Sequence, residues 1–118
     1  MSAAQAEAFY REVLSSQLVW TMFDAGGYPA PLGTSGQRAM PFWSKRSRAQ
    51  RVIDNVPAYS TFDIEEMPLA RWRQELLPGL ERDGLLIGVN WSGKRATGYD
   101  ISPADIVRSL DARALIST

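Results

Sequence analysis

A short basic stretch is the part of this sequence best suited to chemistry. The run PFWSKRSR places Lys45, Arg46 and Arg48 directly after Ser44, where a helix is expected to begin. A helix N-terminus carries partial positive charge, so each exposed cation in the first turn costs up to about 1 kcal/mol. Free backbone N–H groups, a capping hydroxyl and cationic side chains could together bind an anion. The other interpretation is that these cations are solvated or paired with acidic side chains of the same chain.

A second basic point is the expected hairpin turn Ser92-Gly93-Lys94-Arg95, which follows Trp91. If the sheet brings this turn near the helix after Ser44, the two would form one patch flanked by Trp43 and Trp91. We expect both rings to be partly exposed. Basic residues interleaved with aromatic rings suit single-stranded nucleic acid, through stacking and phosphate contacts. Nucleic-acid binding is therefore a further alternative, although a hairpin tip can also be simply solvated.

The chain has no His and no Cys. These residues supply most acid–base catalysis at neutral pH and most transition-metal ligands, so we expect no transition metal and no cofactor. An enzyme would depend on Asp, Glu, Lys, Tyr or Ser, or on magnesium. Asp63 and Glu65 share one face of an expected strand. Asp24 and Asp100 lie near strand ends, so a magnesium site or an acid–base pair could form there. An enzyme acting on a small phosphorylated or carboxylated ligand is the main alternative to a binding role.

The length and the charge of the chain limit the class of protein that it can be. A chain of 118 residues is long enough for one sizeable core, so we expect a single domain over residues 1–118. Thirteen basic residues balance thirteen acidic ones, and net charge gives no long-range attraction to nucleic acid or to an anionic membrane. Met1-Ser2-Ala3 leads directly into a helical pattern without a signal-peptide core. We therefore expect a cytoplasmic protein with no membrane association.

Apolar periodicity predicts an α+β domain with the order α-ββ-αβ-α-ββ-α. Helices are expected over residues 3–16, from Ser44 to Pro57, from Pro68 to Gly84 with a kink or split at Pro78, and after Ser102-Pro103. Strands are expected over residues 17–24, 38–43, 60–65, 85–91 and 96–101, all in one mixed central sheet. An irregular loop over residues 25–37 separates the first two strands, and long loops are often functional.

Local signals add detail to these elements. Ser2-x-x-Gln5 has the form of a capping box, and Ser44 is expected to be an N-cap. Pro41 predicts an edge position or a bulge, because proline cannot donate to a strand ladder. A right-handed crossover should join parallel strands at 38–43 and 60–65. The residues expected to pack in the core are Phe9, Val13, Trp20, Val52, Ile53, Trp72, Leu76, Ile106 and Leu110.

Four segments carry a family resemblance: Ala6-x-x-Phe9, Val19-Trp20-Thr21, the run from Arg38 to Ser44, and the run from Gly84 to Trp91. They resemble the uncharacterised bacterial domain-of-unknown-function 2750 family over nearly the full chain. That family brings no established activity, cofactor or catalytic residue. Pro41-Phe42-Trp43-Ser44 and Ala49 carry a weaker resemblance to the enhanced-serine-sensitivity protein family. This second likeness implies an accessory or interaction role by analogy.

We therefore predict a small bacterial accessory domain that binds a protein partner or an anionic ligand at the Ser44 helix start. The residues expected to form the site are Trp43, Ser44, Lys45, Arg46 and Arg48, together with Trp91, Lys94 and Arg95. If an anion is bound there, Arg46→Glu and Arg48→Glu should each stabilise the free protein by a few tenths of a kcal/mol, through the helix dipole.

Overall fold

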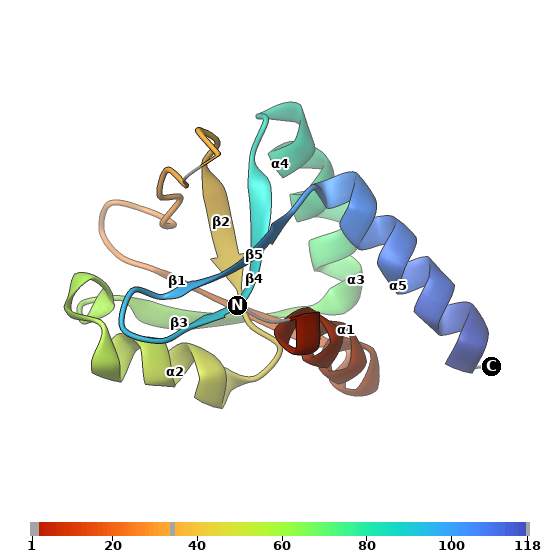
Figure 1. The fold of residues 1–118 in the computed structure, drawn as a ribbon, viewed down its shortest axis with the longest axis horizontal. Helices are drawn as coiled ribbons and strands as arrows, with labels where there is room; N and C mark the ends of the chain where they lie inside the picture. Colours follow the sequence, from red (N-terminus) through yellow and green to blue (C-terminus); the bar gives the residue numbers. More distant parts are fainter. Residues whose placement is uncertain (1–2, 34, 118) are drawn as a thin grey trace.

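The computed structural model describes residues 3–33 and 35–117 (Figure 1). The helices are α1 (Ala3–Ser16), α2 (Arg46–Asn55), α3 (Leu69–Arg71), α4 (Leu77–Arg82) and α5 (Pro103–Ser117), with a 3-10 turn η1 (Pro57–Tyr59) and a π-helical turn η2 (Trp72–Leu76). The strands are β1 (Leu18–Phe23), β2 (Ala39–Phe42), β3 (Asp63–Pro68), β4 (Leu86–Ser92) and β5 (Thr97–Ile101). Because α3, η2 and α4 run on without a break, the expected order of elements is confirmed.

The strands form two sheets. β1 pairs antiparallel with β3, while β2, β4 and β5 form a three-stranded sheet in that order. β2 is parallel to β4, and β4 is antiparallel to β5. The sheets meet where the backbones of Trp20 and Trp43 exchange hydrogen bonds of 2.9 and 2.7 Å. The α+β class is confirmed, whereas the single five-stranded sheet and the parallel pairing of the strands at 38–43 and 60–65 are wrong.

Pro41 explains this division. β2 is an edge strand of its sheet, as Pro41 predicted. The Pro41 carbonyl accepts a hydrogen bond from the Thr21 hydroxyl of β1 at 2.9 Å, so the backbone edge at Pro41 faces β1. That edge lacks an N–H at Pro41 and cannot form a full ladder. β1 therefore crosses β2 at one point and pairs along its length with β3.

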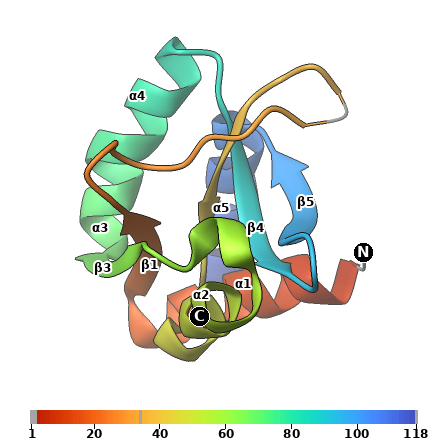
Figure 2. The same ribbon diagram turned by 90° about the vertical axis from the view of Figure 1, so that its left-hand side faces the viewer.

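Two clusters of buried side chains form the core. The first packs α1, the α3–α4 run and α5 against the three-stranded sheet, and in it Trp72 contacts Phe9 and Phe42 edge-on at ring distances of 5.7 and 5.3 Å. The second lies between α2 and both sheets and includes Trp20 and Trp43. Figure 2 shows the α3–α4 run and β5 on opposite sides of β4. All the residues expected to pack in the core belong to these clusters or pack against them.

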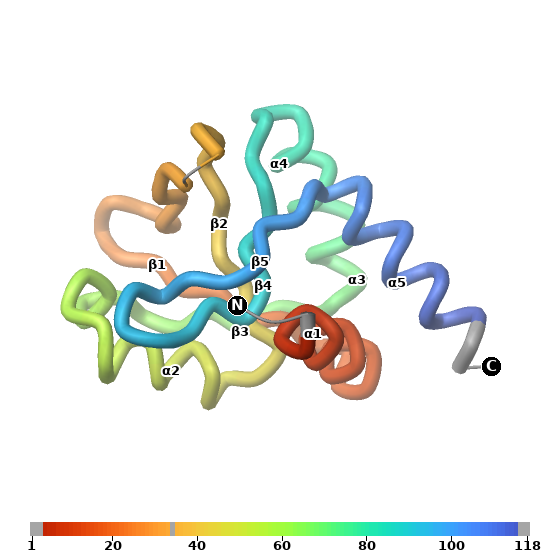
Figure 3. The backbone as a smooth tube through the Cα atoms, viewed as in Figure 1, coloured from red at the N-terminus to blue at the C-terminus, as the bar shows by residue number. Residues whose placement is uncertain are grey.

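Several boundaries differ from expectation. β3 begins at Asp63 instead of residue 60, because η1 precedes it and Tyr59 packs against Phe62 with ring centroids 5.5 Å apart. Pro68 ends β3 and precedes the helix. Pro78 lies in the first turn of α4, directly after the π-helical turn η2 has interrupted the α-helix. Ser2 of the expected capping box lies outside the described residues. The connection between β1 and β2 returns alongside β2 (Figure 3).

The β4–β5 hairpin bends at Asn90. This residue has a φ of 50°, and the strand register shifts between Val89 and Ser92. The Trp91 ring then folds back across the sheet over two glycines. A Cβ built on Gly88 would lie 2.3 Å from Cε2 of Trp91, and one on Gly98 would lie 2.7 Å from its Cδ1. The absence of both side chains is what allows the indole to lie flat on the sheet.

Candidate anion-binding site

The start of α2 is tied to α1 and β4 by a buried polar network. Ser44 is 1% exposed, and its N–H donates to Oδ1 of Asn90 at 3.0 Å. Its hydroxyl accepts from Nδ2 of Asn90 at 2.9 Å and donates to Oε1 of Glu12 at 2.5 Å. The helix itself is preceded by Lys45, which makes no side-chain cap. The prediction of Ser44 as an N-cap is therefore wrong, because its hydroxyl bonds Glu12 of α1 and Asn90 of β4 instead.

Glu12 of α1 is the acidic group opposite this cationic helix start. Nε and Nη2 of Arg48 donate to Oε1 and Oε2 of Glu12, both at 2.9 Å. Nζ of Lys45 lies 3.9 Å from Oε2 of Glu12. Burial would raise the pKa of Glu12, but hydrogen bonds from Arg48 and Ser44 and the nearby positive charges outweigh it, and the pKa is lowered. Pairing within the chain thus accounts for Lys45 and Arg48.

One face of α2 forms a groove with the β4–β5 turn. Arg48, Arg51, Val52 and Asn55 recur at helical spacing, and they face residues 90–94 across a cavity of about 410 Å³. Figure 1 shows the turn passing close to α2. We call this cavity the α2–turn groove. It brings Arg48 and Lys94 together, as the patch hypothesis required. Arg51 was missed by sequence reasoning, although its position three residues after Arg48 on an expected helix could have indicated it.

Two cations of the α2–turn groove have no acidic partner. Within residues 3–33 and 35–117, neither Arg51 nor Lys94 forms an ion pair. The Asn55 amide donates to the Arg51 carbonyl at 2.8 Å and is therefore already engaged. The free positive charge of the groove comes from Arg51 and Lys94, beside an Arg48 that Glu12 holds in place.

The other predicted cations lie elsewhere. Lys45 and Arg46 line a separate hollow of about 710 Å³, together with Arg11 of α1 and Trp20 of β1. Arg95 lines a third cavity with Asp100. The predicted patch is thus divided among three hollows. The hairpin twist and the helical turn point consecutive basic residues in different directions.

Both candidate contact tryptophans are buried. Trp43 is 0% exposed and donates from Nε1 to the carbonyl of Trp91 at 2.9 Å. Trp91 is 6% exposed and donates from Nε1 to Oδ1 of Asp100, also at 2.9 Å. The prediction of partly exposed rings is wrong, because Gly88 and Gly98 let Trp91 pack on the sheet. Neither ring offers a face on which a nucleic-acid base could stack.

The candidate carboxylates are dispersed. Asp24 binds the N–H of Gly26 at 2.8 Å in a turn, and Glu65 accepts a hydrogen bond from the Tyr28 hydroxyl at 2.7 Å. Asp63 is exposed on β3. Across the described part of the chain, no three His, Cys, Asp or Glu side chains gather in a way that could hold a metal ion.

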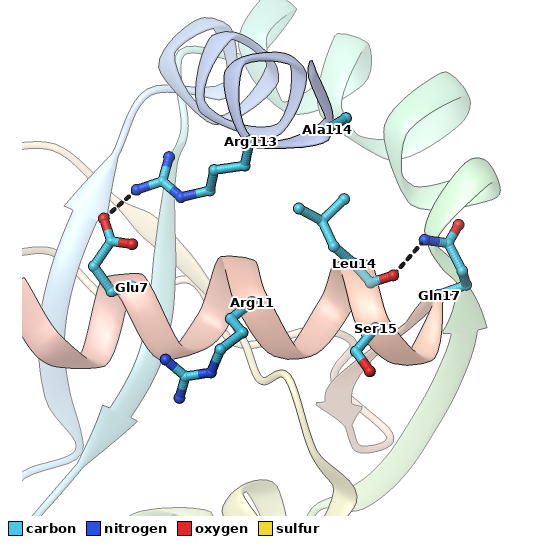
Figure 4. Close-up of a pocket in the computed structure, with 7 residues that line it drawn as sticks. All are labelled: Glu7, Arg11, Leu14, Ser15, Gln17, Arg113 and Ala114. Carbon is cyan, nitrogen blue, oxygen red and sulfur yellow. Dashed lines mark hydrogen bonds and ion pairs between the residues drawn. The ribbon is translucent and has the colours of Figure 1, made fainter. Parts of the chain in front are cut away.

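A further hollow separates α1 from α5. It has a volume of about 670 Å³, and an ion pair between Glu7 and Arg113 bridges the two helices at one side (Figure 4). Leu14 points into it from α1, and Gln17 closes the end of that helix by donating to the Leu14 carbonyl at 2.8 Å. No helix in the described residues is long and apolar enough to span a bilayer.

Comparisons with known proteins give a family and a distant structural likeness. No curated protein matches the chain in sequence. Among solved structures, Anabaena Tic22 (protein transport) is similar at 20% identity with a TM-score of 0.43, over 70% of this chain and 46% of that one. The chain therefore spans about half the length of that protein. The family model described as a protein of unknown function, DUF2750, matches residues 6–110. The chain belongs to the DUF2750 family.

Proposed function

We propose that this protein is a small bacterial accessory domain, acting in the cytoplasm, that binds an anionic group in the α2–turn groove. The group is a carboxylate or phosphate carried by a protein partner or by a small molecule. The observation that carries the proposal is that Arg51 and Lys94 converge on one groove with no acidic partner among the described residues. Opposed cations around a hollow attract and orient an anion.

Arg48 adds a fixed donor to this groove. Its Nε and Nη2 are engaged by Glu12, while Nη1 makes no hydrogen bond within the described chain. A guanidinium held along one edge loses little further freedom when its other edge binds a ligand oxygen. Glu12 offsets the charge of Arg48, so Arg51 and Lys94 supply the net attraction. The groove therefore combines one oriented donor with two cations that have no ion pair within the described residues.

Thermal unfolding in phosphate and in chloride at matched ionic strength tests the small-anion form. Ligand binding to the folded state adds about 1.4 kcal/mol when phosphate is present at about ten times its Kd. Arg51→Glu and Lys94→Glu should each remove the phosphate-specific increase in melting temperature. Arg82→Glu is the matched control, because Arg82 is an exposed helical arginine without an ion pair in the described structure. This control should keep the increase.

A second experiment tests whether the anionic group belongs to a protein partner. A fluorescent peptide rich in glutamate should bind the wild type with an affinity that falls as salt rises, because the attraction is between exposed charges. The same Arg51→Glu and Lys94→Glu variants should lose the peptide, and Arg82→Glu should retain it. If neither phosphate nor the peptide distinguishes these variants from the control, the α2–turn groove is a solvated face and the proposal fails.

A further inference from the structure

Trp91 also lines a second cavity, which the proposed anion site does not use. This cavity has a volume of about 420 Å³ and includes Leu32 and Gly33 of the β1–β2 connection, Tyr59 of η1, and Arg95 and Asp100 of the β4–β5 hairpin. We call it the Asp100 pocket. Its size falls in the usual range for small-molecule sites, and its walls combine apolar surface with a few polar groups.

The carboxylate of Asp100 is held by a hydrogen bond but has no cationic partner among the described residues. Its Oδ1 accepts the hydrogen bond from Nε1 of Trp91 at 2.9 Å. Its Oδ2 is turned toward the β1–β2 connection, since a Cβ built on Gly33 would lie 3.5 Å from it. No Lys or Arg of the described residues forms an ion pair with Asp100. Asp100 is an exposed residue overall, but partial burial of its carboxylate still raises its pKa, and the Trp91 hydrogen bond only partly offsets this effect.

A cation is present in the same cavity but remains separate. Arg95 lines the pocket and forms no ion pair within the described structure. The hydroxyl of Tyr59 likewise has no hydrogen-bond partner in residues 3–33 and 35–117, and burial of this side chain raises its pKa. Leu32, which is 62% exposed, adds apolar surface at the rim. The pocket thus contains one acidic group, one basic group and one hydroxyl group. Within the described residues, these three groups form no ion pair or hydrogen bond with one another.

We propose that the Asp100 pocket binds a small zwitterion, with its ammonium group against the Asp100 carboxylate and its carboxylate near Arg95. A ligand that is only cationic would meet the repulsion of Arg95, and one that is only anionic would meet that of Asp100. A zwitterion satisfies both groups without adding net charge to the cavity. Its carbon skeleton would lie against Leu32 and the Tyr59 ring. This site is separate from the proposed anion site, which depends on Arg51 and Lys94.

The indole N–H of Trp91 provides a direct reporter, because it donates to Asp100. We would titrate the ¹⁵N-labelled protein with the common α-amino acids, with ω-amino acids of two to six carbons, and with butylamine and butyrate. At least one zwitterion should shift the Trp91 indole N–H signal saturably. Butylamine should bind about tenfold more weakly than that zwitterion, which corresponds to the loss of one charge pair, and butyrate should produce no saturable shift.

Two variants test the assignment of charges. Asp100→Asn keeps an oxygen to accept from Trp91 but removes the charge, and it should weaken zwitterion binding by about tenfold or more. Arg95→Gln should weaken it similarly, whereas Asp63→Asn and Arg82→Gln, which change exposed residues outside the pocket, should bind as the wild type does. Arg51→Glu should also leave zwitterion binding unchanged, so failure of the anion proposal would remain distinguishable. The inference is overturned if no zwitterion gives a saturable shift, or if Asp100→Asn binds it as tightly as the wild type.

Discussion

Glu12 neutralises part of the basic motif at the start of α2, because it forms ion pairs with Lys45 and Arg48. It accepts hydrogen bonds from Ser44 and from two nitrogens of Arg48, and it is 14% exposed. Replacing it by glutamine leaves Arg48 without its counter-charge. We expect Glu12→Gln to lower the free energy of unfolding at pH 7 by about 1–3 kcal/mol, as measured by urea denaturation.

The pH dependence of this effect follows from the lowered pKa of Glu12. A carboxyl group whose folded pKa lies below its ordinary value of 4.5 contributes stability above that value and loses it as pH falls through the folded pKa. The difference between wild type and Glu12→Gln should therefore shrink in acid. Glu66→Gln, at an exposed carboxylate without an ion pair in the described structure, is the control and should have little effect at either pH. An equal loss in both variants would show that Glu12 is not specifically paired.

Charge reversals at neighbouring arginines should act in opposite directions. Arg46 has no ion pair in the described residues, so Arg46→Glu should stabilise the protein by a few tenths of a kcal/mol through the helix dipole. Arg48→Glu would face Glu12 directly and leave two carboxylates together, so it should destabilise by about 1–3 kcal/mol. This corrects the expectation from sequence that both reversals would stabilise. Urea denaturation at low salt measures both, and equal signs would contradict the pairing.

Asp100 gives the opposite pH signature to Glu12. Its folded pKa is raised above the ordinary 3.8, so the folded protein takes up the proton first as pH falls. Asp100→Asn should therefore be more stable than wild type at pH 7, by a few tenths of a kcal/mol because the group is partly exposed and screened. The two proteins should converge in stability as pH falls below 3.8. A variant that is less stable than wild type at pH 7 would show that the charge is compensated.

At the scale of elements, local patterns predicted the types of helix and strand but not which strands pair. Apolar spacing and the placement of Gly and Pro lie within short segments, so the order of elements and the core faces of Phe9 and Ile106 followed from them. Strand pairing depends on which edge of β2 offers donors. The sequence does not show which edge of β2 faces β1. The structure shows it, because the Thr21 hydroxyl of β1 donates to the Pro41 carbonyl.

The candidate site shows the same limit. Arg48 and Lys94 could be predicted as site residues from the sequence, because one follows an expected helix start and the other lies in an expected hairpin turn. The structure places both in the α2–turn groove. The pairing of Arg48 with Glu12 joins residues far apart in the chain, and no local pattern indicates it. The burial of Trp91 depends on Gly88 and Gly98 on two strands, a relation that requires the strand register.

At the scale of the whole molecule, the two sheets are joined through a narrow contact. It consists of the backbone pair between Trp20 and Trp43 and the hydrogen bond from Thr21 to Pro41. Both tryptophans also belong to the cluster beneath α2, which contains side chains from both sheets. We therefore expect the sheets to unfold together, with far-ultraviolet circular dichroism and tryptophan fluorescence following one transition.

Thr21→Val tests this junction. Valine keeps the shape of the buried side chain, but it leaves the Pro41 carbonyl without the hydroxyl donor, and this should cost about 1–3 kcal/mol. Thr97→Val, at an exposed position of β5, is the matched control and should stay close to wild type. The two probes should still coincide in Thr21→Val, because the shared apolar cluster remains. Separate transitions in the wild type would show that the sheets are independent units, and an unchanged midpoint in Thr21→Val would show that the Thr21–Pro41 hydrogen bond does not contribute to the junction.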